Sequence, residues 1–192
     1  MLRGLADAVA DSQMIFRAVL DAMAHPGRIV EVPGPLDVPP PLHPAAAAVC
    51  LVLADLETSL WLDRTARTSA AVEFLRFHSG VVIVDTPAAA GFALIADTAS
   101  MPALAEFPQG TDEEPERSAT LIIQVASLDA TGGRRLTGPG IESEARLRAG
   151  GLPSTFWSEI RDNQAAFPRG VDLMLVAGAR LAALPRTTRA DG

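Results

Sequence analysis

The apolar residues of the first 24 positions recur with the period of an α-helix. They fall at Ile15, Phe16, Val19, Leu20, Ala22 and Met23. This spacing predicts a helix over about residues 8–24, which Pro26-Gly27 ends. The apolar arc is wide for a surface helix, so we expect it to pack against a sheet or against a partner protein.

Most other apolar residues form short continuous runs, which are typical of strands covered on both faces of a sheet. The predicted strands are 28–32, 48–54, 59–62, 81–84, 92–96, 120–128, 134–137, 171–177 and 181–184. Gly132-Gly133 is expected to join 120–128 to 134–137 as a hairpin, and Gly178 to form a second hairpin. Further helices are expected at 65–77, at 101–105 after Ser100, and at 153–164.

Helices alternate with strands in the first half of the chain, and hairpins dominate the second half. This order predicts a single α/β domain over residues 1–192, with a mixed sheet flanked by helices in three layers. Prolines hold residues 33–44 extended, and we expect this stretch to be a surface connection because too few residues precede it to form a domain. Residues 189–192 are expected to form a disordered tail.

Composition places the chain among globular proteins, with 48% hydrophobic and 20% charged residues. The net charge of −7 argues against nucleic acid as a partner. The longest apolar run, 45–54, is too short to cross a membrane, and the N-terminus lacks the pattern of a secretory signal. Cys50, the single cysteine, is expected to be a small buried hydrophobe in the strand 48–54. Together these features predict a soluble cytoplasmic protein.

The chain contains no lysine, because all 16 of its basic residues are arginine. A Schiff base with pyridoxal phosphate needs a lysine amine, and the P-loop ends in Gly-Lys-Ser/Thr. Both chemistries are therefore excluded within this chain, and we expect it to carry no cofactor.

Three histidines, His25, His43 and His78, are the natural candidates for metal binding or proton transfer. No pair has the spacing of metal ligands on one helix, so we expect no metal centre. His78 lies between a predicted helix end and a strand. It is either an acid–base group or phosphate contact, or a side chain that interacts with the carbonyls of the last helical turn.

Acidic residues end or follow predicted strands at Asp55, Asp63, Asp85 and Asp97. Carboxylates at the carboxyl ends of strands can serve acid–base chemistry. They are as readily turn residues that accept hydrogen bonds from the backbone two positions on. The sequence pattern alone does not separate the two, and it contains no nucleophile elbow.

Two further segments combine arginine with turn residues. Gly138-Pro139-Gly140 follows Arg134-Arg135, as in an anion-binding nest, but Glu142 and Glu144 would repel an anion, which favours a tight turn. Arg186 in Pro185-Arg186-Thr187-Thr188 either grips a carboxylate or phosphate of a partner, or forms an internal ion pair with a residue such as Asp172.

Eight short segments, each of different sequence, follow one another along the chain from Phe16 to Thr188 and are called the family segments below. They are Phe16-Arg17, Met23 with Pro26-Gly27, Leu53-Ala54-Asp55 with Thr58 and Trp61, Phe77-His78, Thr120-Leu121-Ile122 with Gln124-Val125, Leu136-Thr137-Gly138-Pro139-Gly140-Ile141, Asn163 with Phe167-Pro168-x-Gly170-x-Asp172, and Pro185-Arg186-Thr187-Thr188. Together they resemble the H subunit, the PhnH family, of the bacterial carbon–phosphorus lyase system.

The resemblance implies a fold similar to that of pyridoxal-phosphate-dependent transferases, here without the cofactor. It also implies an accessory subunit that assembles with the G, I and J subunits of a core complex in phosphonate catabolism. In that system, ribose 1-phosphonate 5-triphosphate is made from ATP and a phosphonate. We expect a homodimer when the chain is isolated, with His78 and Arg186 as candidate partner or anion contacts. The alternative is a stand-alone enzyme that acts on a phosphorylated small molecule with His78 as its acid–base group.

Overall fold

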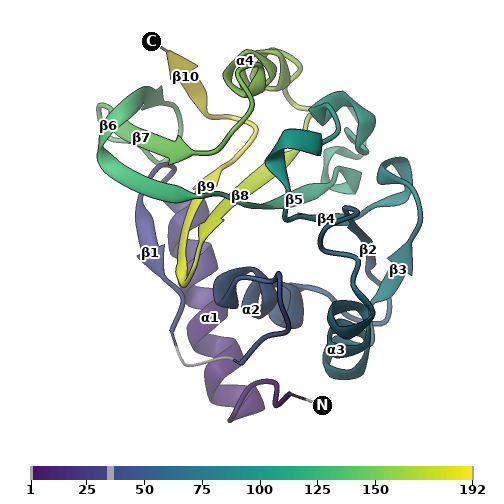
Figure 1. Cartoon of the computed structure of the whole chain (residues 1–192). Coiled ribbons are helices and arrows are strands. Elements are labelled where there is room, and N and C mark those ends of the chain that lie inside the picture. Colours follow the sequence, from purple (N-terminus) through teal and green to yellow (C-terminus); the bar gives the residue numbers. More distant parts are fainter. Residues whose placement is uncertain (1, 34–36, 192) are drawn as a thin grey trace.

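A mixed seven-stranded sheet runs through the centre of the computed structural model, which describes residues 2–33 and 37–191 (Figure 1). Its strands are β1 (Ile29–Glu31), β2 (Ser59–Leu62), β3 (Val82–Val84), β4 (Phe92–Ile95), β5 (Thr120–Gln124), β8 (Asp172–Ala177) and β9 (Arg180–Leu184). The order is β1-β9-β8-β5-β4-β2-β3. Strands β8, β5, β4, β2 and β3 pair in parallel, and β9 pairs antiparallel with both of its neighbours. The prediction of a mixed sheet is therefore confirmed.

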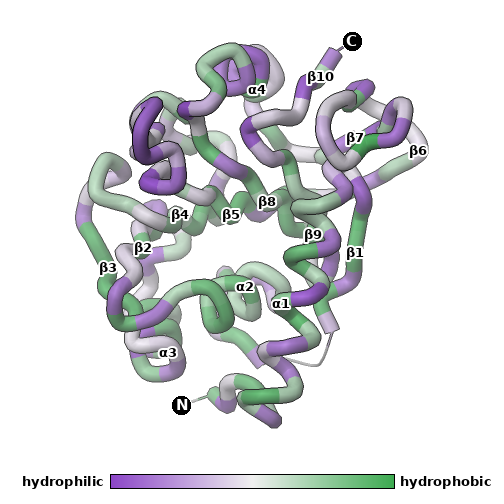
Figure 2. Tube along the Cα trace, turned by 180° about the vertical axis from the view of Figure 1, so that it is seen from behind, coloured by the Kyte–Doolittle hydropathy of each residue, from purple (hydrophilic) through white to green (hydrophobic). Residues whose placement is uncertain are grey.

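Side chains that alternate along these strands enter two separate cores, one on each face of the sheet. On β5, Ile122 joins the core beneath the helices, whereas Leu121 and Ile123 join the core on the opposite face. Figure 2 shows the resulting hydrophobic tracts along the central strands. Burial on both faces explains why these strands read as continuous apolar runs.

The two faces of the sheet are covered differently (Figure 1). One face carries α1 (Ala8–Ala24), α2 (Pro44–Leu53) and α3 (Ser69–Ser79). The other carries α4 (Phe156–Ala165) and an antiparallel sheet of β6 (Ser127–Thr137), β7 (Ala145–Gly150) and β10 (Arg189–Asp191). Short 3₁₀ helices lie at Pro87–Ala89, Thr98–Ser100, Leu104–Glu106 and Pro115–Arg117. The three layers agree with the prediction, but the second face is covered largely by strands rather than by helices.

The predicted strand 48–54 is wrong, because this segment belongs to helix α2. Pro44 occupies the first turn of the helix, where its missing N–H is not needed, and the four alanines that follow favour helix. Residues 45–50 are buried all round, so the segment lacks the polar positions that give a surface helix its 3.6-residue period. An apolar run of this kind does not distinguish a buried helix from a buried strand.

The predicted hairpin at Gly132-Gly133 is also wrong. Strand β6 continues through these glycines and pairs with β7, and its register jumps from Asp129 opposite Arg148 to Arg134 opposite Leu147. The glycines therefore form an excursion within one long strand. The predicted strand 120–128 is in turn divided between β5, which ends at Gln124, and β6, which begins at Ser127.

Several other predictions are confirmed. The first helix spans Ala8–Ala24 as expected, with Asp7 as its N-cap. Helix α3 ends at Gly80, which has a left-handed φ of 74°, although Thr68 caps it later than expected. β8 and β9 form the hairpin around Gly178. The helix expected at 101–105 is wrong, because residues 101–103 lie outside helices and strands and the 3₁₀ turn Leu104–Glu106 covers the rest. Val82 on the edge strand β3 is half-exposed rather than buried.

In the segment expected to connect elements over about 33–44, residues 33 and 37–43 lie outside helices and strands, and residues 34–36 lie outside the described residues. Leu42 and Pro39 within it are buried, so the connection packs against the body of the protein. The expected disordered tail at 189–192 is corrected for residues 189–191, which form β10 and pair with β6, while Gly192 is outside the described residues.

Candidate functional site

Arg186, one of the two candidate contact residues, forms the ion pair with Asp172. Its Nη2 lies 2.7 Å from Asp172 Oδ2, and its Nε donates to Asp172 Oδ1 at 3.2 Å. Nη1 donates to the carbonyl oxygens of Pro115 at 2.7 Å and Pro168 at 3.3 Å, and Nη2 also donates to the Ser118 hydroxyl. These contacts use all five guanidinium N–H groups. The geometry supports the internal ion pair, since no N–H remains for an external anion.

This arginine joins segments that are far apart in the sequence. Its main-chain N–H also donates to Asp172 Oδ1 at 2.8 Å, so the carboxylate binds both the backbone and the guanidinium. The Arg186 side chain is only 13% exposed and that of Asp172 is 19% exposed. The pair therefore fixes the start of β8 to the segment after β9 and to the loop around Pro115.

Asn163 and Gly170, which belong to one of the family segments, form a second structural contact. Asn163 is buried and exchanges two hydrogen bonds with the backbone of Val171, at 2.8 and 2.9 Å. Gly170 has φ of 120°, and a Cβ there would lie 2.8 Å from Asn163 Oδ1. These residues connect α4 to β8.

His78, the second candidate, holds the N-terminal segment of the chain. Its Nε2 lies 3.1 Å from the carbonyl oxygen of Leu2, and its ring packs edge-on against Phe74 and Phe77. Gly4 approaches so closely that a Cβ there would lie 2.6 Å from Nδ1 of the histidine. The expectation that His78 bonds to its own helix end is corrected, because the carbonyl it contacts belongs to residue 2.

Among the candidate carboxylates, Asp63 is buried at the end of β2. It accepts main-chain hydrogen bonds from Ala66 at 2.7 Å and from Ala96 and Asp97 at 2.8 Å each. Both oxygens are occupied by backbone N–H groups. Asp63 thus ties the end of β4 to the turn after β2.

The other three carboxylates stabilise turns or pair at the surface. Asp55 accepts hydrogen bonds from the hydroxyl of Thr58 and from the N–H two residues on, and these bonds lower its pKa. Asp97 caps a 3₁₀ turn in the same way, and Asp85 pairs with Arg67. The turn interpretation fits Asp55, Asp63 and Asp97, whereas Asp85 lies in a surface ion pair.

Cys50 lies in the buried helix α2, where burial raises the pKa of its thiol to about 12. The prediction of a small buried residue is confirmed, although the element is a helix rather than a strand. Within residues 2–33 and 37–191, no group of three His, Cys, Asp or Glu side chains is arranged to hold a metal ion.

Two of the family segments, those that contain Gly27 and Gly140, meet where α1 ends. A Cβ on Gly140 would lie 2.1 Å from the carbonyl oxygen of Ala24, and one on Gly27 would lie 2.7 Å from Leu136 Cδ1. The turn after β6 is thus pressed against the end of the first helix. Beside this contact lies a groove of about 780 Å³, lined by His25, Pro26, Gly27, Arg28, Ala130, Gly140, Ile141, Glu142, Glu144, Ala145 and Arg146.

The charges of this groove are largely paired. Arg28 lies 3.0 Å from Asp21, and Glu144 accepts a hydrogen bond from Arg135 at 2.7 Å that lowers the pKa of Glu144. Glu142 adds a further carboxylate to the rim. The mixed charge does not favour an anion, in agreement with the interpretation of Gly138-Pro139-Gly140 as a tight turn.

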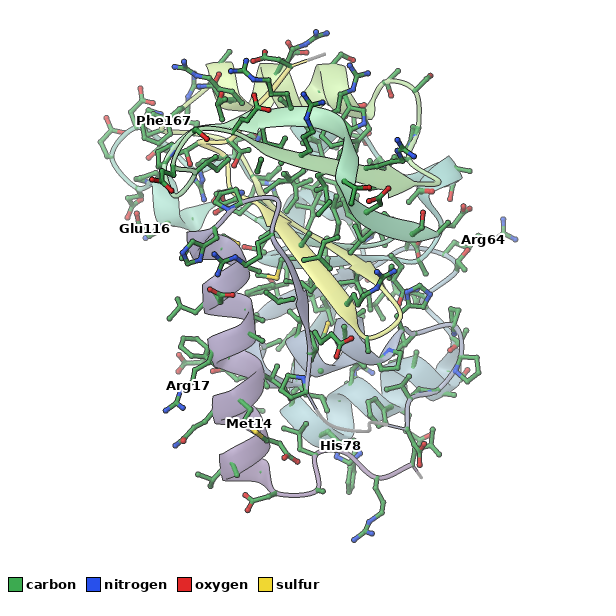
Figure 3. The ribbon with its side chains drawn as sticks, turned by 90° about the vertical axis from the view of Figure 1, so that its left-hand side faces the viewer. Met14, Arg17, Arg64, His78, Glu116 and Phe167 are labelled. Carbon is green, nitrogen blue, oxygen red and sulfur yellow. The ribbon has the colours of Figure 1, made fainter. Side chains whose placement is uncertain are left out.

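The outer face of α1 carries exposed apolar side chains. Ile15, Val19 and Ala22 are buried against α2 and β9, but Phe16 is 47% exposed and Leu20 is 56% exposed. Val9 extends this exposed face by two turns, whereas the half-exposed Met14 lies on the opposite flank of the helix. Figure 3 shows Arg17 and Met14 on different sides of α1. The sequence pattern assigned Phe16 and Leu20 to the apolar arc that packs against the protein, and it did not identify Val9 or Met14 as exposed. The width of that arc could have indicated exposed apolar residues, because it is wider than the surface that one packing contact covers.

None of the helices in the described ranges is long and apolar enough to span a membrane.

Comparisons with known proteins agree over nearly the whole chain. Residues 3–191 match the family described as bacterial phosphonate metabolism protein (PhnH). The chain is 38% identical over 188 residues to the alpha-D-ribose 1-methylphosphonate 5-triphosphate synthase subunit PhnH of Rhizobium meliloti (strain 1021), covering 97% of this chain and 93% of that protein. It is 34% identical over 189 residues to the putative C-P lyase subunit protein HtxG of Stutzerimonas stutzeri, covering 92% and 84% respectively. The chain therefore belongs to the PhnH family.

Proposed function

We propose that this chain is an accessory subunit of a carbon–phosphorus lyase core complex in phosphonate catabolism. There it supports the formation of ribose 1-phosphonate 5-triphosphate from ATP and a phosphonate. The observation that carries the proposal is the match to a named synthase subunit over nearly the full length of both chains. The second relative, named as a C-P lyase subunit, supports the same role.

In this proposal the partners are the G, I and J subunits, and the contact surface is the outer face of α1. Val9, Phe16 and Leu20 lie on one side of the helix and are each between 47% and 69% exposed. Contiguous exposed apolar residues on a soluble protein commonly mark a protein interaction site. The isolated chain forms a homodimer through this face, and in the complex part of it is taken by the G or I subunit. The complex is cytoplasmic.

The subunit does not break bonds itself. What supports this is that the strongest candidates for chemistry have structural partners. The five guanidinium N–H groups of Arg186 all donate to acceptors within the protein. Asp63 accepts three hydrogen bonds from backbone N–H groups. His78 contacts a main-chain carbonyl. No observation favours the alternative of a stand-alone enzyme that uses His78.

The fold is further proposed to be that of the large domain of pyridoxal-phosphate-dependent transferases. A seven-stranded mixed sheet with one strand, β9, running against the rest supports this proposal. Because the chain has no lysine, the likeness is one of architecture only. Visible absorbance of an internal aldimine in the purified protein would contradict it.

The proposed contact surface is tested by co-expressing a tagged chain with the G, I and J subunits. Phe16→Asp combined with Leu20→Asp places two charges on the apolar face, and Leu56→Asp is the matched control because Leu56 is 76% exposed on another surface. We expect the double variant to remain folded, to become monomeric in light scattering and to lose the partner subunits. The control should retain both. Full partner yield with the double variant would overturn the proposed surface.

The accessory role is tested by activity. The purified chain alone should not convert ATP and methylphosphonate, whereas the assembled complex with its ATP-dependent partner should. His78→Ala in the complex should leave turnover close to the wild-type rate. Loss of a catalytic acid–base group typically costs a factor of 10²–10⁴. A loss of that size from His78→Ala, with the complex assembled in full yield, would place His78 in an active site.

A further inference from the structure

The excursion in β6 shapes a pocket that the proposed function leaves unused. Between Asp129 and Arg134 the strand leaves its register with β7, and residues 130–133 have no partner in the pairing. Gly133 has φ of 87°, and a Cβ there would lie 2.3 Å from the carbonyl oxygen of Leu147. Only glycine allows the backbone to fold this tightly onto β7. The pocket lies beside this turn.

Arginine and tryptophan side chains line this pocket. Its volume is about 250 Å³, and its lining residues are Gly133, Arg134, Leu147, Arg148, Ala149 and Trp157. No carboxylate is among them, although the chain contains 23 Asp and Glu residues. The pocket therefore differs in charge from the larger groove at the end of α1, where Glu142 and Glu144 accompany the arginines.

The two guanidinium groups of the pocket make only weak contacts with the rest of the fold. Within residues 2–33 and 37–191, neither Arg134 nor Arg148 makes a side-chain hydrogen bond, in contrast to the five donors of Arg186 that are all engaged. Arg148 is 66% exposed and lies 3.9 Å from Asp129, too far for a hydrogen bond. Arg134 lies over the indole of Trp157, 5.9 Å from the ring centroid, which orients it at the pocket.

We propose that this pocket binds the dianionic tetrahedral oxyanion group of a phosphate monoester. A guanidinium matches the oxygens of such a group with two parallel N–H bonds, and two guanidinium groups match its charge. The volume is below the roughly 300–1,000 Å³ of sites for whole drug-sized ligands, so one charged group and its nearest atoms fill it. This inference depends on the side chains of β6, β7 and α4 and stands whether or not the accessory role is correct.

The surroundings of the pocket favour an approaching anion. Strands β6, β7 and β10 together carry five arginines and two aspartates, in a chain whose net charge is −7. The carboxylates in the turn between β6 and β7 lie at the groove by α1 rather than in the pocket. A local positive potential of this kind raises the concentration of anions at the surface, although salt screens it over about 8 Å at physiological ionic strength.

Binding is measured by fluorescence of Trp157 in the full chain. Trp61 and Trp157 are the two tryptophans, so Trp61→Phe leaves a single reporter at the pocket. The probes are glycerol phosphate, sulfate and acetate, each titrated at low ionic strength and at constant salt. Isothermal titration calorimetry on the wild-type chain provides a second readout that does not depend on the indole.

We expect saturable binding of glycerol phosphate and sulfate, and weaker binding of acetate. Lowering the pH from 7.5 to 5 should weaken glycerol phosphate but not sulfate, because a phosphate monoester loses its second charge near pH 6. The nearest carboxylate, Asp129, has its pKa lowered by a hydrogen bond from the Thr131 side chain and stays ionised at both pH values.

Single substitutions distinguish binding at the pocket from attraction to the overall charge of the protein. Arg134→Gln and Arg148→Gln should each weaken binding roughly tenfold or more, since a hydrogen bond to a charged group contributes about that factor. Arg17→Gln removes the same charge from α1, on the other side of the central sheet, and should leave the affinity unchanged.

Three results would each overturn the proposal. The first is the absence of saturable binding in both readouts. The second is equal weakening of binding by Arg17→Gln and Arg148→Gln. The third is unchanged anion binding in Arg134→Gln and Arg148→Gln while these variants lose the partner subunits on co-expression, which would assign the two arginines to a protein contact instead.

Discussion

Replacement of Arg186 by alanine removes the most extensively bonded side chain of the described structure. The guanidinium binds the Asp172 carboxylate, two main-chain carbonyl oxygens and the Ser118 hydroxyl. After the change, Asp172 keeps only the main-chain N–H of residue 186 as a partner among these groups. The variant therefore leaves a largely buried carboxylate without its counter-charge.

The expected loss is about 3 kcal/mol in the free energy of unfolding. Removing one partner of a buried ion pair costs about 3–5 kcal/mol, and the lower end applies because Asp172 remains 19% exposed. For a protein of this size, 1 kcal/mol lowers Tm by about 2–4 °C, so Tm should fall by about 6–12 °C. Arg186→Lys keeps the charge but loses the planar five-donor fork, and we expect it to cost about 1–3 kcal/mol.

Urea unfolding followed by tryptophan fluorescence gives the change in free energy, provided that the m-value is unchanged. The control is Arg135→Ala, which breaks an ion pair of similar length, 2.7 Å to Glu144, but at a position 48% exposed. Exposed pairs contribute about 0–1 kcal/mol, so this variant should be nearly neutral. If Arg186→Ala unfolds within 1 kcal/mol of the wild type yet abolishes activity of the assembled complex, the structural assignment of Arg186 is refuted.

Three further predictions follow from individual contacts. Gly178→Ala should cost about 1 kcal/mol, because residue 178 has a left-handed φ. Gly140→Ala should destabilise the protein more, because residue 140 has a left-handed φ and its added Cβ would also meet a backbone atom. Thermal unfolding measures both variants. Asp63→Asn should cost about 1–3 kcal/mol in urea unfolding, because one of its two acceptor oxygens is lost in a buried turn. The thiol of Cys50 should not react with a disulfide reagent at pH 8 until the chain unfolds. Because burial raises its folded pKa from 9.0 to about 12, stability should fall as pH rises between these values, where only the unfolded thiol ionises.

The sequence by itself determined the elements whose local signals agree with their final packing. The first helix has a periodic apolar face and a stop at Pro26-Gly27, and α3 ends at the glycine expected to cap it. The hairpin of β8 and β9 follows from two apolar runs around Gly178. Family membership was also readable, because it depends on the order of short segments rather than on three-dimensional proximity.

Only the tertiary structure decided features that depend on contacts between distant residues. Residues 44–53 begin with Pro44 and four alanines, which favour a helix, but they are apolar on all sides, so their periodicity does not tell a helix from a strand. The burial of this segment between the other helices and the sheet is visible only in the structure. Gly132-Gly133 has the composition of a hairpin turn, but long-range pairing with β7 keeps both glycines inside β6. The number of hydrogen bonds that an arginine makes within the fold depends on the same kind of contact. The Arg186 guanidinium donates to the Asp172 carboxylate and to the carbonyl oxygens of Pro115 and Pro168. Arg134 and Arg148 instead face a pocket whose lining contains no carboxylate, although the type of residue is the same.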